Sequence, residues 1–173
     1  MIGKKHCQYK FFYINIFISL FFIALFVAPI IHVLEVKDIQ KNEILFQEKI
    51  FPGYVFATKI RHSVQLSPVF EFYEIDHSYD IILTKTIIKD LGWGMPSSPE
   101  GKLQIQNGVI IIDDIHRKIP VLRFRVSYIA EPEFILRGRT YDLRFLVDDS
   151  HSLEILSKKI SALSRIYYFF AKE

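Results

Sequence analysis

The chain has 173 residues, of which 22 are Lys or Arg, 19 are Asp or Glu and one is Cys. This length suffices for one domain of ordinary size, and a single Cys excludes both an intramolecular disulfide framework and a zinc site built from several thiolates. Lys4, Lys5 and Lys10 precede the first acidic residue, Glu35; subtracting them leaves 19 basic against 19 acidic residues. This balance excludes a nucleic-acid binder, which carries its cations on the folded part.

Residues 11–31 are uncharged and mostly apolar. A helix over this range, rising ~1.5 Å per residue, would be roughly 30 Å long, about the thickness of a bilayer core. We predict a basic cytoplasmic N-terminus at 1–10 and a transmembrane anchor at 11–31. The alternative is a cleaved signal peptide, but its apolar region usually has about 7–15 residues and a small-x-small site, whereas Ala24 and Ala28 lie further apart. The lysines predict a single-pass inner-membrane protein with its N-terminus inside and its domain in the periplasm.

Residues 33–157 contain short runs rich in Val, Ile, Phe and Tyr, separated by turn residues, which is typical of an all-β domain. The predicted strands are 44–51, 54–60, 69–75, 81–89, 109–113, 121–129 and 141–148. Turns are predicted at Pro52-Gly53, Asn107-Gly108 and Arg137-Gly138, and Asn107-Gly108 is the strongest signal for a two-residue hairpin. We therefore predict a small antiparallel β-sandwich or barrel-like domain after one N-terminal transmembrane helix.

The tail at 158–173 has a different pattern. Apolar residues recur at three- and four-residue spacing, which predicts a short amphipathic C-terminal helix. These residues are Ile160, Leu163, Ile166, Tyr167 and Phe170. The helix either packs on the sheet or, through its aromatic side chains and neighbouring cations, lies in a lipid headgroup layer.

The densest group of unusual residues begins with the connection between the strands at 54–60 and 69–75. Extended chain on both sides of this connection brings His62 and Glu71 onto adjacent strands. Glu71 shares a face with apolar residues of its own strand, where a carboxylate is costly unless it is paired and hydrogen-bonded. We therefore predict that His62 pairs with Glu71. The pair either fixes the loop structurally or belongs to an interaction surface.

A second unusual segment, Gly92-Trp93-Gly94-Met95-Pro96, follows the predicted strand at 81–89. Glycine permits positive φ and close backbone approach, so the two glycines indicate a specific loop shape. Trp93 either packs over the sheet edge as a plug or is displayed for a partner.

Neither segment carries a catalytic motif. Ser63 follows His62 directly, and neighbours on an extended strand point to opposite faces, so His62 is badly placed to activate Ser63. The sequence contains no Gly-x-Ser-x-Gly elbow and no phosphate-binding loop. The histidines at 62, 77, 116 and 151 are isolated, without the spacing of metal ligands. We expect neither enzymatic activity nor a metal or cofactor.

The residues His62-Ser63-Val64, Pro68-Val69 and Glu71, followed by Gly92-x-Gly94-x-Pro96, resemble the family called domain of unknown function 1850 (DUF1850). The resemblance covers about residues 48–157. It implies a small protein with one N-terminal hydrophobic segment and a β-rich extracytoplasmic domain. It also implies a link to tripartite ATP-independent periplasmic (TRAP) transporters of the kind that uses a TAXI-type solute-binding protein, and it implies no established reaction.

We therefore expect a membrane-anchored, non-catalytic accessory or interaction protein whose partners are TRAP membrane subunits or a TAXI solute-binding protein, and not nucleic acid. The expected interaction surface consists of His62, Ser63, Pro68, Glu71, Gly92, Trp93, Gly94 and Pro96. The alternative is an extracytoplasmic small-molecule or lipid-binding β module. Its ligand would contact aromatic residues that are otherwise core, namely Phe56, Phe70, Phe72, Tyr73 and Trp93.

Overall fold

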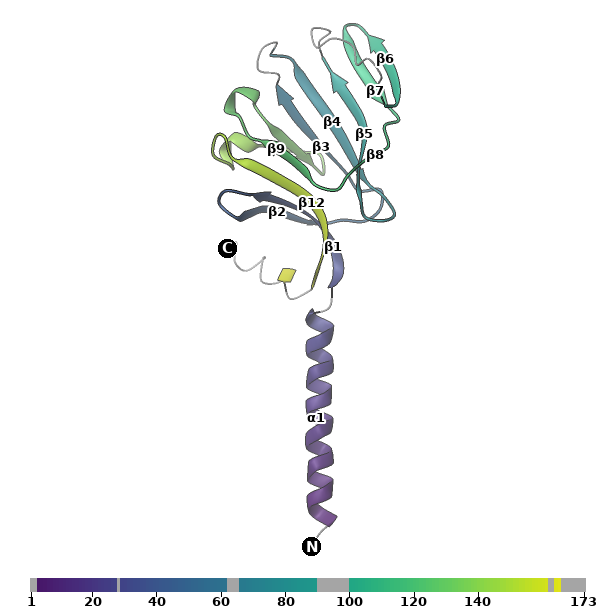
Figure 1. Cartoon of the computed structure of the whole chain (residues 1–173), viewed down its shortest axis with the longest axis vertical. Helices are drawn as coiled ribbons and strands as arrows, with labels where there is room; N and C mark the ends of the chain where they lie inside the picture. The colour runs from purple at the N-terminus through teal and green to yellow at the C-terminus, as the bar shows by residue number, and fades with distance from the viewer. Residues whose placement is uncertain (1–2, 28, 62–65, 90–99, 162–163, 166–173) are drawn as a thin grey trace. The chain divides into compact units, whose positions relative to one another are not determined.

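The computed structural model describes residues 3–27, 29–61, 66–89, 100–161 and 164–165 (Figure 1). The chain divides into two compact units, one of residues 1–31 with 159–173 and the other of residues 32–158. Within the described residues there are one long helix and twelve strands, all of whose assigned register pairs are antiparallel. The predicted all-β character of the domain is therefore confirmed.

Helix α1 (Gly3–Val27) covers most of the predicted anchor. Strand β1 (Pro29–Asp38) begins inside the predicted range 11–31, so the prediction is wrong at 29–31. Pro29 lacks an N–H and is unsuited to the interior of a helix. Across the described part of the chain, no helix combines the length and the hydropathy needed to cross a membrane, and the transmembrane character of the anchor stays a proposal.

The strands form two sheets. The smaller sheet has the order β2–β1–β12–β9, in which β2 is Glu43–Lys49, β12 is Ser152–Ser161 and β9 is Leu122–Arg125. The larger sheet has the order β11–β10–β3–β4–β5–β7–β6, and β8 also pairs with β5. Its strands are β3 (Val55–Arg61), β4 (Pro68–Ile75), β5 (Ile81–Ile88), β6 (Lys102–Gln106), β7 (Val109–Asp113), β8 (Arg117–Ile119), β10 (Glu133–Leu136) and β11 (Arg139–Asp142).

Five predicted strands are confirmed to within two residues at each end, as β2, β3, β4, β5 and β7. The hairpin predicted at Asn107-Gly108 is confirmed as well, because it joins β6 to β7 with Gln106 paired to Val109. Asn107 and Gly108 have φ of 50° and 78°. Two consecutive positive φ angles define the type I′ turn, whose twist matches that of the flanking strands.

The predicted strand at 121–129 is wrong beyond Arg125. β9 ends there, and the 3₁₀ helix η2 (Tyr128–Ala130) follows. The Asp149 carboxylate accepts a hydrogen bond from the Tyr128 N–H at 2.8 Å. This side chain takes up a backbone donor that a continuing strand would have used in its ladder.

The predicted strand at 141–148 is wrong beyond Asp142, where the 3₁₀ helix η3 (Leu143–Phe145) replaces it. The Asp142 carboxylate caps this turn by accepting the Arg144 N–H at 3.0 Å. The turn breaks the predicted alternation of inward and outward side chains, because Leu143 is buried whereas Phe145 is 83% exposed.

The predicted amphipathic helix at 158–173 is wrong at its start, because β12 continues to Ser161. Residues 164–165 are helical. Residues 166–173 lie outside the described residues, so the remainder of this prediction is untested.

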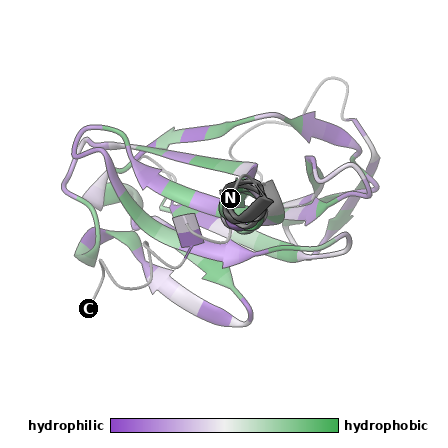
Figure 2. Ribbon diagram, turned by 90° about the horizontal axis from the view of Figure 1, so that it is seen from below, coloured by the Kyte–Doolittle hydropathy of each residue, from purple (hydrophilic) through white to green (hydrophobic). Residues whose placement is uncertain are grey.

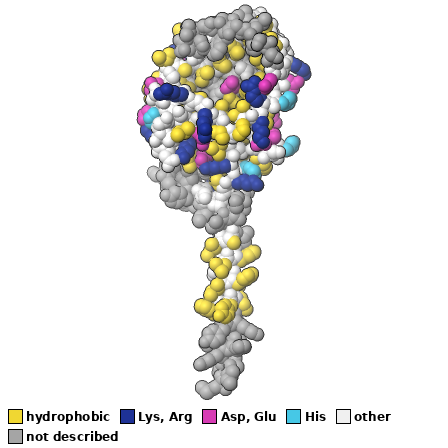
Figure 3. All heavy atoms as spheres, viewed as in Figure 1, with side chains coloured by type: hydrophobic (Ala, Val, Ile, Leu, Met, Phe, Trp, Pro, Cys, Tyr) yellow, Lys and Arg dark blue, Asp and Glu magenta, His cyan; other side chains and the backbone are white. Residues whose placement is uncertain are grey.

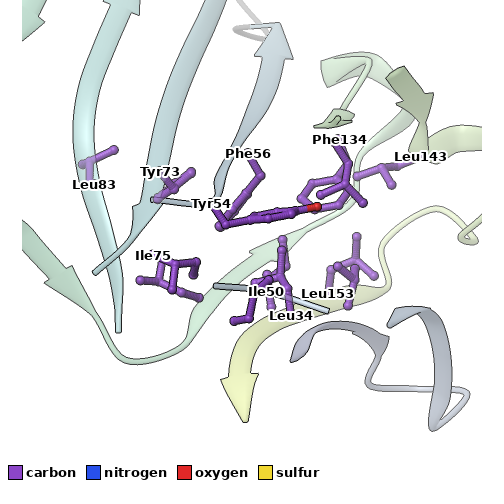
Figure 4. Close-up of a cluster of buried hydrophobic side chains, with 14 of the residues drawn as sticks. Leu34, Ile50, Tyr54, Phe56, Tyr73, Ile75, Leu83, Phe134, Leu143 and Leu153 are labelled. Atoms are coloured by element: carbon purple, nitrogen blue, oxygen red, sulfur yellow. The ribbon is translucent and has the colours of Figure 1, made fainter. Parts of the chain in front are cut away.

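Side chains from both sheets form one hydrophobic core (Figure 4). Leu34 on β1 and Leu153 on β12 belong to the same buried cluster as Phe56, Tyr73 and Phe134 on the larger sheet. The rings of Phe56 and Tyr73 are stacked, with centroids 5.0 Å apart. Hydrophobic and hydrophilic residues alternate along many of the strands (Figure 2), as expected for a sheet with one buried face.

Two buried carboxylates tie β1 to β12 and to the residue just before it. Glu35, 3% exposed, accepts hydrogen bonds from the Lys158 ammonium at 2.6 Å and from the Gln47 amide at 3.0 Å. Asp38 is fully buried, and its Oδ2 lies 2.8 Å from Nδ1 of His151. Burial tends to raise the pKa of the Asp38 carboxyl, but the hydrogen bond with His151 and those from backbone N–H groups outweigh it, so the pKa lies below its ordinary value.

We expect the Asp38 pair to contribute to acid denaturation. Its carboxyl has a lower pKa in the folded chain than in the unfolded chain, where the value is about 3.9. The group therefore stabilises the fold above about pH 4, and this contribution is lost as the pH falls through the folded-state pKa. Urea unfolding between about pH 6 and pH 3 should show a loss of stability on acidification that is smaller in Asp38→Asn.

The matched control is Glu43→Gln, which neutralises an exposed carboxylate on β2. It should retain the acid sensitivity of the parent chain. Identical pH profiles for Asp38→Asn and the parent would contradict the assignment.

Candidate functional site

The two predicted interaction loops leave the larger sheet at the same end. The first joins β3, which ends at Arg61, to β4, which begins at Pro68; the second follows β5, which ends at Ile88. The Lys89 N–H donates to the Pro68 carbonyl at 3.2 Å, and Val69 is paired with Ile88. The described ends of both loops therefore lie side by side, although the loops are far apart in sequence.

Only part of the predicted surface can be placed. Pro68 is the first residue of β4, a position where its missing N–H is tolerated. Glu71 lies in the middle of the same strand. The other predicted residues lie outside the described residues, namely His62, Ser63, Gly92, Trp93, Gly94 and Pro96. The pairing of His62 with Glu71 and the surface as a whole stay predictions.

Glu71 has hydroxyl-bearing residues on its own strand and on both neighbouring strands. Thr58 on β3 and Thr86 on β5 are its register partners, and the Tyr73 hydroxyl donates to Glu71 Oε2 at 2.7 Å. The residues Thr58, Glu71, Tyr73 and Thr86 form what we term the hydroxyl cluster. Val69, Tyr73 and Ile75 are buried, as predicted for the face that Glu71 shares.

Tyr73 is the donor in this cluster and remains protonated. Burial raises the pKa of its phenol above the ordinary value, and the charge of Glu71 together with the hydrogen bond to it raises that pKa further. The cluster therefore combines a carboxylate with a neutral phenol. This arrangement suits hydrogen bonding, because a phenol with a raised pKa does not serve as a base near neutral pH.

Arg61 connects the end of β3 to the segment around η2. Its Nη2 lies 3.1 Å from Glu131 Oε1 and donates to the Ile129 carbonyl at 3.4 Å. Glu131 also lies 3.6 Å from the Arg144 guanidinium, which precedes the exposed Phe145. Sequence patterning missed this region, because the residues that become η2 and η3 alternate like strand residues.

Two shallow hollows lie elsewhere on the β domain. The larger, about 470 Å³, is lined by Ile39, Arg123, Phe124, Arg125, Ser152 and Glu154. The smaller, about 170 Å³, is lined by Glu74, Asp76, Ile82, Thr84 and His116. Neither contains a residue of the predicted surface. Several charged groups inside them have structural partners, since Arg123 pairs with Glu154 at 2.6 Å and Asp76 accepts two backbone N–H groups.

Among the residues that the structure describes, no three His, Cys, Asp or Glu side chains lie close enough to hold a metal ion. Among the described residues, His116 lies 3.2 Å from the Asp114 carboxylate and His151 lies 2.8 Å from the Asp38 carboxylate. These contacts are hydrogen-bonded pairs within the fold.

We expect Tyr73→Phe to lower the free energy of unfolding by about 1–3 kcal/mol, because it removes the donor to a half-buried carboxylate. Glu71→Ala should also destabilise the domain, and the two effects should not add, since both substitutions remove one hydrogen bond. Chemical unfolding of the single and double variants measures the coupling.

Tyr128→Phe is the control, because it removes a hydrogen bond from a tyrosine to the neutral carbonyl of Val147. It should cost less, about 0.5–1.5 kcal/mol. Additive effects of Tyr73→Phe and Glu71→Ala would show that the contact carries no stability.

The model of one protein family, described as "Domain of unknown function (DUF1850)", matches residues 56–143. This is half of the chain, and it runs from β3 to the start of η3. The matched range contains the hydroxyl cluster and both loop ends. Comparisons with curated proteins and with solved structures found no match.

Proposed function

Because the chain belongs to the DUF1850 family, we propose that it is a non-catalytic accessory protein that binds a component of a TRAP transport system of the TAXI type. The proposed contact surface lies where the β3–β4 and β5–β6 loops leave the larger sheet. The observation that carries this proposal is the hydrogen bond between Lys89 and Pro68, since it holds the ends of both loops together. The choice of a TRAP system as the partner rests on the family resemblance of the sequence.

The larger sheet supports this proposal as a rigid base for recognition loops. Binding residues often lie on loops that a regular scaffold positions. β4 is paired on both sides. The hydroxyl cluster adds a side-chain contact within β4, a few residues away from the ends of the loops. A tryptophan in such a loop, here Trp93, is a residue type enriched among the dominant contacts of interfaces.

The ligand-binding alternative has less support from the described side chains. Of the aromatic residues considered for a ligand, Phe56 and Tyr73 are 3% and 2% exposed and stack on each other in the core. Phe70 lies on the opposite face of β4 from Val69, and the Lys89 ammonium is 5.5 Å from its ring centroid. These rings therefore do not line a common site.

We also propose that α1 anchors the protein in the inner membrane, with the β domain in the periplasm. Large apolar side chains are exposed along its described part (Figure 3), among them Phe12, Phe17, Leu20, Phe21, Phe22 and Ile23. Apolar side chains exposed around a whole helix favour a lipid environment. The lysines that precede the apolar run favour a cytoplasmic N-terminus.

The membrane proposal predicts that the full chain stays in the pellet after alkaline carbonate extraction. The variant Leu20→Lys/Ile23→Lys should move substantially to the supernatant, because each lysine at mid-membrane costs about 2.5–3.5 kcal/mol. Phe145→Lys, which changes an exposed residue of the β domain, should stay in the pellet. Intact mass spectrometry separates an anchor from a signal peptide, and a mature chain lacking 11–31 would overturn the anchor.

The transport proposal predicts that affinity purification of the tagged full chain from detergent-solubilised native membranes recovers TRAP membrane subunits or a TAXI solute-binding protein. Trp93→Ala should lose these partners while the thermal unfolding midpoint stays unchanged. The matched control is Phe145→Ala, which removes an exposed aromatic outside both loops and should keep them.

Two results would contradict the transport proposal. One is recovery of no transport component under conditions that preserve known membrane complexes. The other is equal capture by Trp93→Ala and the parent chain. Native mass spectrometry that shows a retained small molecule would instead favour the β module that binds a ligand.

A further inference from the structure

Strand β6 (Lys102–Gln106) ends the order of the larger sheet (Figure 1). Among the described strands it pairs with β7 and with no other. Such an edge presents backbone N–H and C=O groups that can pair with another chain. The question is which strand this edge is suited to receive.

The register of the β6–β7 hairpin fixes which groups face outward. The type I′ turn at Asn107-Gly108 places a hydrogen bond between Gln106 and Val109, and hydrogen-bonded pairs alternate with non-bonded pairs along an antiparallel ladder. Lys102, Gln104 and Gln106 therefore direct their backbone groups toward β7. Leu103 and Ile105 direct theirs away from β7, toward the edge that no described strand covers, which we term the open edge.

The sequence of β6 is complementary to itself in the antiparallel direction. When two copies overlap over the whole strand, Gln104 meets Gln104 of the second copy, Leu103 meets Ile105, and Lys102 meets Gln106. The only charged residue of the strand therefore faces an amide. Leu103 is half-buried and Ile105 is 46% exposed, so this pairing would remove apolar surface from water.

The backbone pattern agrees with the same overlap. Leu103 and Ile105, whose N–H and C=O groups face the open edge, become the pair that exchanges hydrogen bonds between copies. Gln104 becomes a non-bonded pair at the two-fold axis. The register in which the two strands overlap fully thus satisfies both the side-chain pairing and the backbone hydrogen bonding.

One of the two edge strands of the smaller sheet, β9, behaves differently. In β9 (Leu122–Arg125), an antiparallel pairing of two copies that keeps side chains on matching faces centres on Arg123 or on Phe124. Either centre places arginine opposite arginine, and like charges directly opposite each other are destabilising. Self-pairing is therefore opposed at β9 and unopposed at β6.

We propose that β6 pairs antiparallel with β6 of a second copy of this chain, with Gln104 at the two-fold axis, so that the two larger sheets become continuous. The interface is isologous, since each copy contributes the same strand. This proposal goes beyond the partner proposed above, because it uses the backbone edge of β6 (Lys102–Gln106), which is not part of the contact surface at the β3–β4 and β5–β6 loops. Cross-linking is read separately from partner capture, so either proposal can fail alone.

Site-directed cross-linking of the full chain in detergent tests the register. In a Cys7→Ser background, Gln104→Cys would place two thiols on a non-bonded pair with Cα atoms about 4.5 Å apart, within disulfide range. In Gln106→Cys, on the same strand, the Cα atoms of residue 106 in the two copies would be separated by four residues along the ladder. This distance is roughly 13 Å and lies beyond disulfide range. Mild oxidation should give a reducible dimer on a non-reducing gel for Gln104→Cys, and this dimer should be lost for Gln106→Cys.

Ile105→Pro tests the hydrogen bonds between copies. The N–H that it removes faces the open edge, so the β6–β7 ladder keeps its bonds. Added to Gln104→Cys, it should abolish the cross-link while leaving the thermal unfolding midpoint of the monomer nearly unchanged.

The comparison of the two cysteine variants decides the matter even if Ile105→Pro fails to fold. Equal cross-linking of Gln104→Cys and Gln106→Cys would indicate random collision and overturn the proposal. No cross-link for Gln104→Cys, at protein concentrations matching those in the membrane, would overturn it as well.

Discussion

The burial of Tyr73 is the constraint on which the rest of the β domain depends. Its ring stacks on Phe56 inside the core, while its hydroxyl donates to Glu71 on the same strand. A shift of β4 by one residue would turn every side chain to the opposite face, removing the ring from the core and placing Glu71 on the other face. The ring of Tyr73 and its hydroxyl thus both require the same register of β4. That register in turn determines where both loops leave the sheet.

Among the strands whose positions could be predicted, burial alternates with a period of two in β7 and at the start of β5. β3 was found without such alternation, since Phe56, Ala57 and Thr58 are all buried, and its position followed from its β-forming residues and the Pro52-Gly53 turn before it. β1 could not be separated from the anchor, because Pro29, Ile30 and Ile31 continue the same apolar run. A run that is apolar at every position contains no period from which a strand could be distinguished from a helix.

The failures at η2 and η3 have another cause. The residues around Tyr128 and Leu143 alternate as strand residues do, but two aspartates take up backbone donors there. Asp142 caps a turn locally, and this could be suspected from its sequence position. Asp149 reaches Tyr128 across a separation of 21 residues, a contact that local patterning does not contain. One partner of Glu71 was within reach of the sequence, since Tyr73 lies two residues along the same face. The predicted pairing of Glu71 with His62 lies outside the described residues and stays a prediction.

The arrangement of β1 and β12 has a mechanical consequence. β1 follows α1 directly in the chain and lies inside the smaller sheet, between β2 and β12. A pull applied along the axis of β1 would load its ladders on both sides in shear, so that many hydrogen bonds must break together rather than in succession. The contacts of Glu35 with Lys158 and of Asp38 with His151 lie across the same junction. If α1 anchors the protein as proposed, this arrangement would make the β domain resist such a pull at its point of attachment.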